Sequence, residues 1–124
     1  RVREIMDRTV VSVLEDDAIA TAAEKLLKGE TNHIPVEDRE GRLVGIVTTY
    51  DVSKAVLRPG TLHKVKDIMT RRVIKTTPDE AVDVAAQKLK KNNISALPVV
   101  DAGDQVVGML TALDLGKLIS RREP

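Results

Sequence analysis

Apolar residues recur along this chain with the spacing of an amphipathic helix, and they do so twice. The first set lies on one face of a predicted helix: Ala18, Ile19, Ala22, Ala23, Leu26 and Leu27. The second set repeats this face further along the chain: Ala81, Val82, Ala85, Ala86 and Leu89. Short runs rich in β-branched residues precede both sets, at residues 10–13 and 73–76, and they predict strands.

The second helix has a start signal of its own. Thr77 is a typical N-cap residue, Pro78 suits the first helical position, and Glu80 supplies an acid three residues after the threonine. The first helix is preceded instead by acidic residues 15–17, which favour the positive end of a helix dipole. We therefore expect the second helix to begin at Thr77.

Two more strands are predicted after each helix, and the last strand runs into a closing helix. Turns at residues 38–41 and 101–104 join these strands. The order is β-α-β-β-α, twice, which predicts a mixed α/β (α+β) fold. Neither half offers a large core alone, so we expect the two repeats to pack through their sheets with pseudo-twofold symmetry.

The two halves are a tandem repeat in sequence as well as in pattern. The step from Ile5-Met6 to Ile68-Met69 is 63 residues, and the same step relates Ile34-Pro35-Val36 to Leu97-Pro98-Val99. We place the first repeat at residues 1–57, a linker containing the Pro59-Gly60 turn signal at residues 58–64, and the second repeat at residues 65–121.

Composition narrows the class of protein. The 124 residues are 42% hydrophobic, which argues against disorder, and no apolar run is long enough to span a membrane. The absence of cysteine excludes disulfides and thiolate chemistry and is consistent with a cytoplasmic protein. A net charge of +1 makes nucleic acid an unlikely partner. The sequence opens on Arg1 and not on Met, so a longer polypeptide around it stays an open alternative.

A motif of Gly, two apolar residues, Thr, two variable residues and Asp ends each repeat. It runs from Gly45 to Asp51 and again from Gly108 to Asp114. One interpretation is structural, because Thr followed three residues later by an acid forms a capping box, and Gly permits close packing. The other is a nucleotide site, because a helix N-terminus accepts phosphate and a carboxylate accepts hydrogen bonds from a ribose diol. The two interpretations are compatible.

Together these features resemble a CBS domain pair over residues 2–119. The resemblance rests on the repeat, the Ile-Pro-Val and Leu-Pro-Val segments, the doubled motif, and the openings Val2-Arg3-Glu4-Ile5-Met6 and Val65-Lys66-Asp67-Ile68-Met69. It implies a regulatory module without catalytic activity or a required cofactor. Such modules bind an adenosine derivative (AMP, ADP, ATP, S-adenosylmethionine or 5′-methylthioadenosine) in clefts between the repeats. They control an attached or partner protein, and they commonly form homodimers.

The resemblance also implies the site residues. The first site would use Thr48 and Asp51 for phosphate and ribose, His33 for phosphate, and these residues around adenine: Thr76, Ser95, Ala96 and Leu97. The second site would use Thr111 and Asp114, with these residues beside the base: Val11, Val13, Asn32, His33 and Ile34. Tyr50, within the first motif, would stack on a ligand or pack in a dimer interface. We expect the Asp51 site to be the better nucleotide site, because Ala96 stands where the other half has His33.

Several alternatives stay open at this stage. A dimerisation scaffold with degenerate clefts is the main competing function. An enzyme is disfavoured, because the sequence has no cysteine nucleophile, no histidine-rich metal cluster and no Gly-x-Ser-x-Gly elbow. His33 is either a ligand contact or a strand-edge residue. The basic residues near the second opening either reach a phosphate or are surface charges: Lys64, Lys66, Arg71 and Arg72. The sequence leaves the particular ligand and the regulated protein undetermined.

Overall fold

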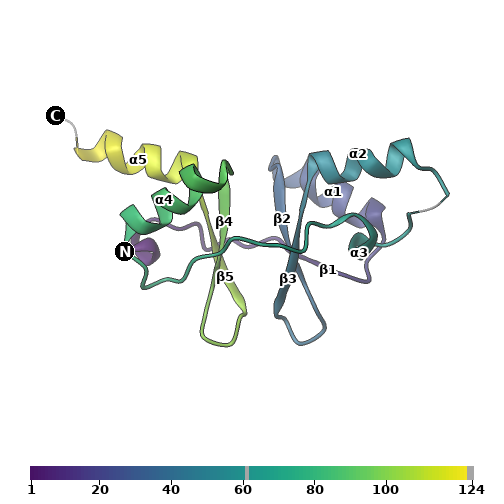
Figure 1. Cartoon of the computed structure of the whole chain (residues 1–124), viewed down its shortest axis with the longest axis horizontal. Helices are drawn as coiled ribbons and strands as arrows, with labels where there is room; N and C mark the ends of the chain where they lie inside the picture. The colour runs from purple at the N-terminus through teal and green to yellow at the C-terminus, as the bar shows by residue number, and fades with distance from the viewer. Residues whose placement is uncertain (61, 123–124) are drawn as a thin grey trace. The chain divides into compact units, whose positions relative to one another are not determined.

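The computed structural model describes residues 1–60 and 62–122, with side chains described as far as Ser120. The first repeat contains η1 (Val2–Glu4), β1 (Val13–Leu14), α1 (Ile19–Gly29), β2 (His33–Glu37), β3 (Leu43–Thr48) and α2 (Thr49–Leu57). The second repeat contains α3 (Val65–Ile68), α4 (Val82–Asn92), β4 (Ala96–Val100), β5 (Val106–Thr111) and α5 (Ala112–Arg122). The fold is thus mixed α+β with two sheets, as the sequence predicts (Figure 1).

The chain forms two compact units, and they exchange the openings of the two repeats. The β1–β3 unit is Val11–Val73, and the β4–β5 unit joins residues 1–10 to residue 74 onward. The opening of the second repeat therefore packs in the unit built from the first repeat, and the first opening packs in the unit built from the second. This exchange is a feature that the linear repeat does not reveal.

The β1–β3 unit has a three-stranded sheet. Strand β1 pairs with β2 in parallel, and β2 pairs with β3 antiparallel. Helices α1 and α2 lie on one side of this sheet (Figure 1). The core is aliphatic, and the exchanged opening contributes to it: Val13, Ala22, Leu26, Ile34, Val36, Val47, Val65, Ile68 and Met69. Because these side chains lose contact with water, their burial stabilises the unit.

The β4–β5 unit repeats this plan with a shorter sheet. Strands β4 and β5 pair antiparallel, and Thr76 forms an isolated parallel bridge with Val99. Helices α4 and α5 lie on one side of the two strands (Figure 1). The core again includes the exchanged opening: Val2, Met6, Ala85, Leu89, Leu97, Val99 and Leu110.

The first strand of each repeat is shorter than the sequence predicts. In the first repeat only Val13 and Leu14 are paired as a strand, and in the second only Thr76 is bridged. Most residues of the two β-branched runs are therefore chain outside the sheets. Only Val13 and Leu14 in the first repeat and Thr76 in the second pair with a neighbouring strand.

The predicted N-cap at Thr77 is wrong, because α4 begins at Val82 with Ala81 as its N-cap. Residues 78–80 form a turn instead, closed by the Glu80 N–H donating to the Thr77 carbonyl at 3.2 Å. Two carbonyls of this segment accept from the exchanged opening: Val2 N–H donates to Glu80 O and Arg3 N–H to Pro78 O. An α-helix through these residues would use the same carbonyls internally, so the docked opening favours the turn.

Candidate functional site

The first copy of the motif forms a reciprocal capping box at the start of α2. The backbone N–H and the hydroxyl of Thr48 donate to Oδ2 of Asp51 at 3.0 and 3.1 Å. The Asp51 N–H donates back to the Thr48 hydroxyl oxygen at 3.2 Å. Asp51 is only 2% exposed, so this carboxylate is held rigidly at the end of β3. The structural interpretation of the motif is therefore correct. A capping box is also compatible with ligand binding at the same residues.

A cation also holds Asp51. The ammonium of Lys54, one turn further along α2, donates to Oδ1 of Asp51 at 3.0 Å. The same nitrogen lies 5.7 Å from the centre of the Tyr50 ring, within the range of a cation–π contact. Tyr50 is 74% exposed. Sequence reasoning missed Lys54, although its place three residues after the aspartate is a helical spacing that brings side chains together.

The second copy of the motif repeats the capping box at the start of α5. The N–H and hydroxyl of Thr111 donate to Oδ2 of Asp114 at 2.9 and 3.1 Å, and the Asp114 N–H donates back at 3.3 Å. Lys117 matches Lys54 in the repeat. It lines a hollow of about 420 Å³ together with Glu4, Ile5, Met6, Asp7 and Asp114. Three carboxylates and one ammonium therefore surround this hollow.

The predicted ligand contacts that precede Pro35 and Pro98 lie beside the threonines of the two motifs. His33 is the cross-strand partner of Thr48, and Ala96 is the partner of Thr111. The Asn32 carbonyl accepts from the Thr49 N–H at 3.3 Å, and the Ser95 carbonyl accepts from the Ala112 N–H at 3.0 Å. These bonds fix both segments at the N-termini of α2 and α5.

His33 is half-buried, and burial lowers its pKa below the ordinary value of 6.5. The imidazole is therefore biased toward its neutral form, which is a hydrogen-bonding group for a phosphate but a weak counter-charge. Ile34 and Leu97 are fully buried in the two cores, so contact with a base would fall to their backbone groups.

Thr76 is the buried member of a polar network whose other members are partly exposed. Its hydroxyl donates to Oε1 of Glu80 at 2.7 Å, and the residue is 1% exposed. Lys88 on α4 pairs with Glu80 at 2.8 Å and also donates to the Lys75 carbonyl at 2.9 Å. In the first repeat the place of Thr76 is taken by Val13, a core residue paired with Val36. Sequence reasoning assigned Glu80 to a helix start and missed Lys88, and the structure gives the Thr76 hydroxyl a structural partner in Glu80.

Three of the basic residues near the second opening have acidic or backbone partners: Lys64, Lys66 and Arg71. Lys66 and Lys64 lie 3.2 and 3.8 Å from Oδ1 of Asp16, and Lys66 holds the pKa of Asp16 below its usual value. Arg71 donates to the Lys66 carbonyl at 3.2 Å. Arg3 pairs with Asp79 at the matching place in the β4–β5 unit. These groups attach the openings to their units, which favours the surface-charge interpretation over a phosphate role.

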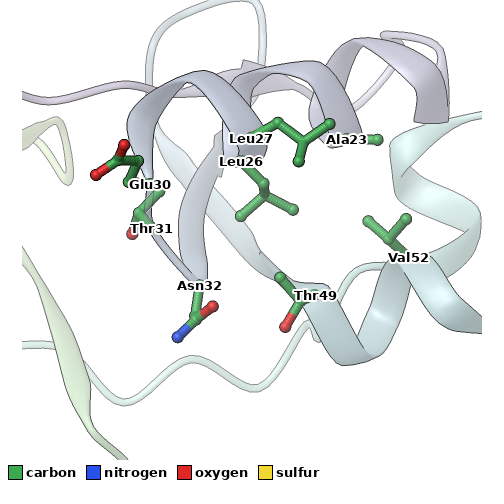
Figure 2. A pocket seen from close by; sticks show the side chains of 8 residues that line it. All are labelled: Ala23, Leu26, Leu27, Glu30, Thr31, Asn32, Thr49 and Val52. Carbon is green, nitrogen blue, oxygen red and sulfur yellow. The ribbon is translucent and has the colours of Figure 1, made fainter.

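A further hollow lies between α1 and α2. It measures about 400 Å³ and is lined by Ala23, Leu26, Leu27, Glu30, Thr31, Asn32, Thr49 and Val52. Figure 2 shows that Leu26 and Val52 point into the space between the two helices. Its lining is mostly apolar, and Leu27 at its rim is 80% exposed.

Comparison with known proteins identifies the family. The family model described as the CBS domain matches residues 2–58 and 65–121. The chain belongs to the CBS domain family. Its two matched repeats make it a CBS domain pair, and pairs of this family are generally regulatory.

Curated relatives of this CBS pair are longer proteins. An L-aspartate semialdehyde sulfurtransferase of Methanosarcina acetivorans is 36% identical over 121 residues, which are 98% of this chain and 24% of that protein. A homoserine O-acetyltransferase of Methanococcoides burtonii is 39% identical over 118 residues, which are 95% of this chain and 24% of that protein. The chain thus spans 24% of the length of both relatives.

Solved CBS pairs have the same fold and hold adenosine derivatives. The CBS domain pair of protein MJ0100, in complex with 5′-methylthioadenosine and S-adenosyl-L-methionine, gives a TM-score of 0.88 at 38% identity, covering 98% of this chain and 97% of that one. CBSX2 in complex with AMP gives a TM-score of 0.86 at 26% identity, covering 97% of this chain and 96% of that one.

The structure gathers the predicted CBS site residues in two groups. The β1–β3 unit holds His33, Thr48, Tyr50 and Asp51 near one another, with Asn32 and Ile34 adjoining. The same unit also contains Val11 and Val13. The β4–β5 unit holds Thr76, Ser95, Ala96, Leu97, Thr111 and Asp114. Joint use of both groups by one ligand stays a prediction.

Residues 1–60 and 62–122 of this CBS pair include neither a membrane-spanning helix nor a metal-binding cluster. No helix among them combines the length and apolar character needed to cross a membrane. Nor do three or more His, Cys, Asp or Glu side chains gather in this part of the chain in a way that could hold a metal ion.

Proposed function

We propose that this CBS pair is a ligand-sensing regulatory module that binds an adenosine derivative through its two Thr–Asp motifs. The observation that carries the proposal is the pair of capping boxes, each presenting a fixed carboxylate beside the N-terminus of a helix. The carboxylate accepts hydrogen bonds from a ribose diol, and the helix N-terminus favours a negative or polar 5′ group. The module needs no cofactor for this role and has no catalytic activity of its own.

Two lines of support narrow the ligand to S-adenosylmethionine or 5′-methylthioadenosine ahead of the nucleotides. The first is the similar CBS pair of MJ0100, which holds both compounds. The second is the charge around Asp114, where the carboxylates of Glu4, Asp7 and Asp114 outnumber the one ammonium in the same hollow, that of Lys117. Phosphate groups are repelled by such a surface, whereas a sulfonium or an uncharged thioether is tolerated. On the same reasoning the Asp51 motif is the better place for AMP, because the ammonium of Lys54 lies nearby and neutral His33 offers a hydrogen bond to phosphate.

The partner that we propose is an enzyme acting on an aspartate-derived amino acid, linked to this module in one chain or bound to it. The relatives whose names describe such reactions contain a matching segment within a longer protein. We also propose that the module works in the cytoplasm and that neither a nucleic acid nor a membrane is its partner.

We propose a homodimer as the assembled form. Exposed apolar side chains on the closing helices of both units support it: Tyr50, Val56 and Leu57 on α2, and Leu113 and Ile119 on α5. The same exposed side chains support the second candidate function, a dimerisation scaffold whose ligand sites are no longer used. Sedimentation at several protein concentrations tests the dimer.

A thermal-shift and calorimetry series tests the ligand proposal. The ligands are AMP, ADP, ATP, S-adenosylmethionine and 5′-methylthioadenosine, and uridine monophosphate is the control for nonspecific effects. A ligand at 100 times its Kd stabilises the folded state by about 2.7 kcal/mol, which raises Tm by several degrees. We expect such a shift with S-adenosylmethionine or 5′-methylthioadenosine. No shift with any adenosine compound would leave the scaffold as the function.

A further inference from the structure

We infer that Lys54 competes with the ribose of the ligand for Asp51 and thereby sets the affinity of the site at α2. The inference rests on the proposed function, because it assumes that Asp51 accepts the ribose hydroxyls. It adds a specificity-determining residue outside the Thr–Asp motif.

The acceptor capacity of Asp51 is nearly used up. An ionised carboxylate offers about four acceptor positions, two on each oxygen. Oδ2 already accepts from the N–H and the hydroxyl of Thr48. Oδ1 accepts from the ammonium of Lys54 at 3.0 Å, which leaves one position on that oxygen. A ribose diol brings two O–H donors, so it binds fully only when the ammonium leaves Oδ1.

Burial explains why Lys54 is there in the first place. The side chain of Asp51 is 3% exposed, and a carboxylate withdrawn from water is costly unless it is paired. Lys54 provides that pairing, and the ring of Tyr50 lies 5.7 Å from its nitrogen. The Lys54 side chain is itself 45% exposed, so its ammonium reaches water by a rotamer change. Exchange of the ammonium for two hydroxyls is therefore sterically simple.

The other motif lacks this competitor. Within the described residues Asp114 has no ion pair, although Lys117 stands at the position that matches Lys54. Lys117 shares its hollow with Glu4, which pairs with the N-terminal ammonium at 2.8 Å, and with Asp7. Competition at the carboxylate is thus expected for Asp51 and not for Asp114.

The test compares Lys54→Met with the parent in an Asp114→Ala background, which removes the ribose acceptor of the other motif. The probe is 5′-methylthioadenosine, which carries no charged group for Lys54 to attract. Calorimetry should show binding about 1.5- to fivefold tighter in Lys54→Met, which corresponds to the loss of a partly exposed ion pair. Lys54→Arg keeps the cation and should bind like the parent. Lys28→Met in the same background is the matched control, because it removes the cation of an exposed ion pair with Glu24 outside both motifs, and it should leave the affinity unchanged.

Ionic strength separates competition from a merely structural effect. Raising salt from about 0.01 M to about 1 M shortens the Debye length from about 30 Å to about 3 Å. It weakens the ion pair in part, because the Lys54 side chain is 45% exposed whereas that of Asp51 is 3% exposed. Affinity of the parent should therefore rise with salt, while that of Lys54→Met stays flat. Lys54→Gln serves as the second variant, and circular dichroism checks that each variant is folded.

Each outcome has a distinct meaning. Tighter binding in Lys54→Met together with the loss of salt dependence supports the inference. Equal or weaker binding in Lys54→Met and Lys54→Gln, with the parent's salt response retained, overturns the inference and leaves the proposed function intact. If neither the parent chain nor any variant binds an adenosine compound, the proposed function fails, and the inference fails with it.

Discussion

Gly45 on β3 lies against Met69 of the exchanged opening, so closely that a Cβ on Gly45 would stand 2.7 Å from the Met69 sulfur and 3.0 Å from the Thr70 carbonyl oxygen. Gly108 has the same relation to the first opening, where a Cβ would stand 2.9 Å from the Asp7 carbonyl oxygen. The glycine of the motif therefore serves the close approach of two backbones. This explains why the motif and the openings occur together in both repeats.

Replacing Gly45 with alanine should destabilise the protein. The Met69 side chain can shift away from a new methyl group, but the Thr70 carbonyl belongs to a backbone bridge with Ile46. Overpacking of this kind costs about 1–3 kcal/mol in the free energy of unfolding. Urea denaturation measures it. Gly116→Ala is the matched control, because no atom lies within 4 Å of its new Cβ and alanine favours the helix; an equal loss in both variants would contradict the explanation.

Removing the carboxylate of Asp51 should weaken ligand binding. A hydrogen bond to a charged group contributes roughly 1.5–3 kcal/mol, so Asp51→Ala should raise Kd by about ten- to a hundredfold or more. The same change at Asp114 should act on the other motif alone, which calorimetry separates as two binding events. Loss of the capping box also lowers stability, so urea denaturation of the free variants supplies the correction. Unchanged affinity in both variants would contradict the ribose assignment.

Thr76→Val should lower stability even though valine fills the same position in the first repeat. The hydroxyl that donates to Glu80 would be lost, and Glu80 would keep only Lys88. We expect a loss of about 0.5–1.5 kcal/mol in the free energy of unfolding. Calorimetry on the same variant tests the predicted adenine contact. A Kd that differs from the parent's Kd by more than the error of the measurement supports the contact. An unchanged Kd assigns Thr76 a structural role alone.

Protonation of His33 should destabilise the fold. Burial lowers the pKa of His33 in the folded state, so the unfolded chain takes up a proton first as the pH falls. The stability contributed by neutral His33 is therefore complete above the ordinary pKa of 6.5 and is lost as the pH falls from there toward the folded-state pKa. Urea denaturation between pH 7.5 and the lower end of this window measures the slope.

His33→Gln should remove this part of the pH dependence, and His63→Gln, at an exposed position, is the matched control. An NMR titration of the His33 ring gives the direct reading. A ring that titrates at or above its ordinary value would contradict the effect of burial.

Much of the site could be predicted from the sequence, because its signals are local. Thr48 and Asp51 stand three residues apart, and a capping box needs only that spacing at a helix start. The repeat offset then assigns Thr111 and Asp114 the same role, and both boxes are present in the structure. Lys54 could have been found by the same helical spacing, but its choice between solvent and Asp51 depends on how deeply Asp51 is buried.

The start of α4 could not be predicted locally. Thr77 and Pro78 have the residue types of a helix start, yet their segment forms a turn whose carbonyls accept from Val2 and Arg3. Those donors lie more than seventy positions earlier in the chain. A contact between segments so far apart cannot be predicted from a short stretch of sequence. It outweighs the local preference for a helix start because it satisfies backbone donors of the docked opening.

The sequence by itself determined the tandem repeat, the aliphatic cores, the hairpins and the two capped helices, because each depends on spacing within a few turns or on a constant offset. Only the tertiary structure decided that the openings change places, that Gly45 and Gly108 serve backbone contact, and that Lys54 holds Asp51. These three features depend on burial and on distances between segments far apart in the chain. Hydrophobic packing is non-directional, so it determines these contacts only when the whole unit has formed.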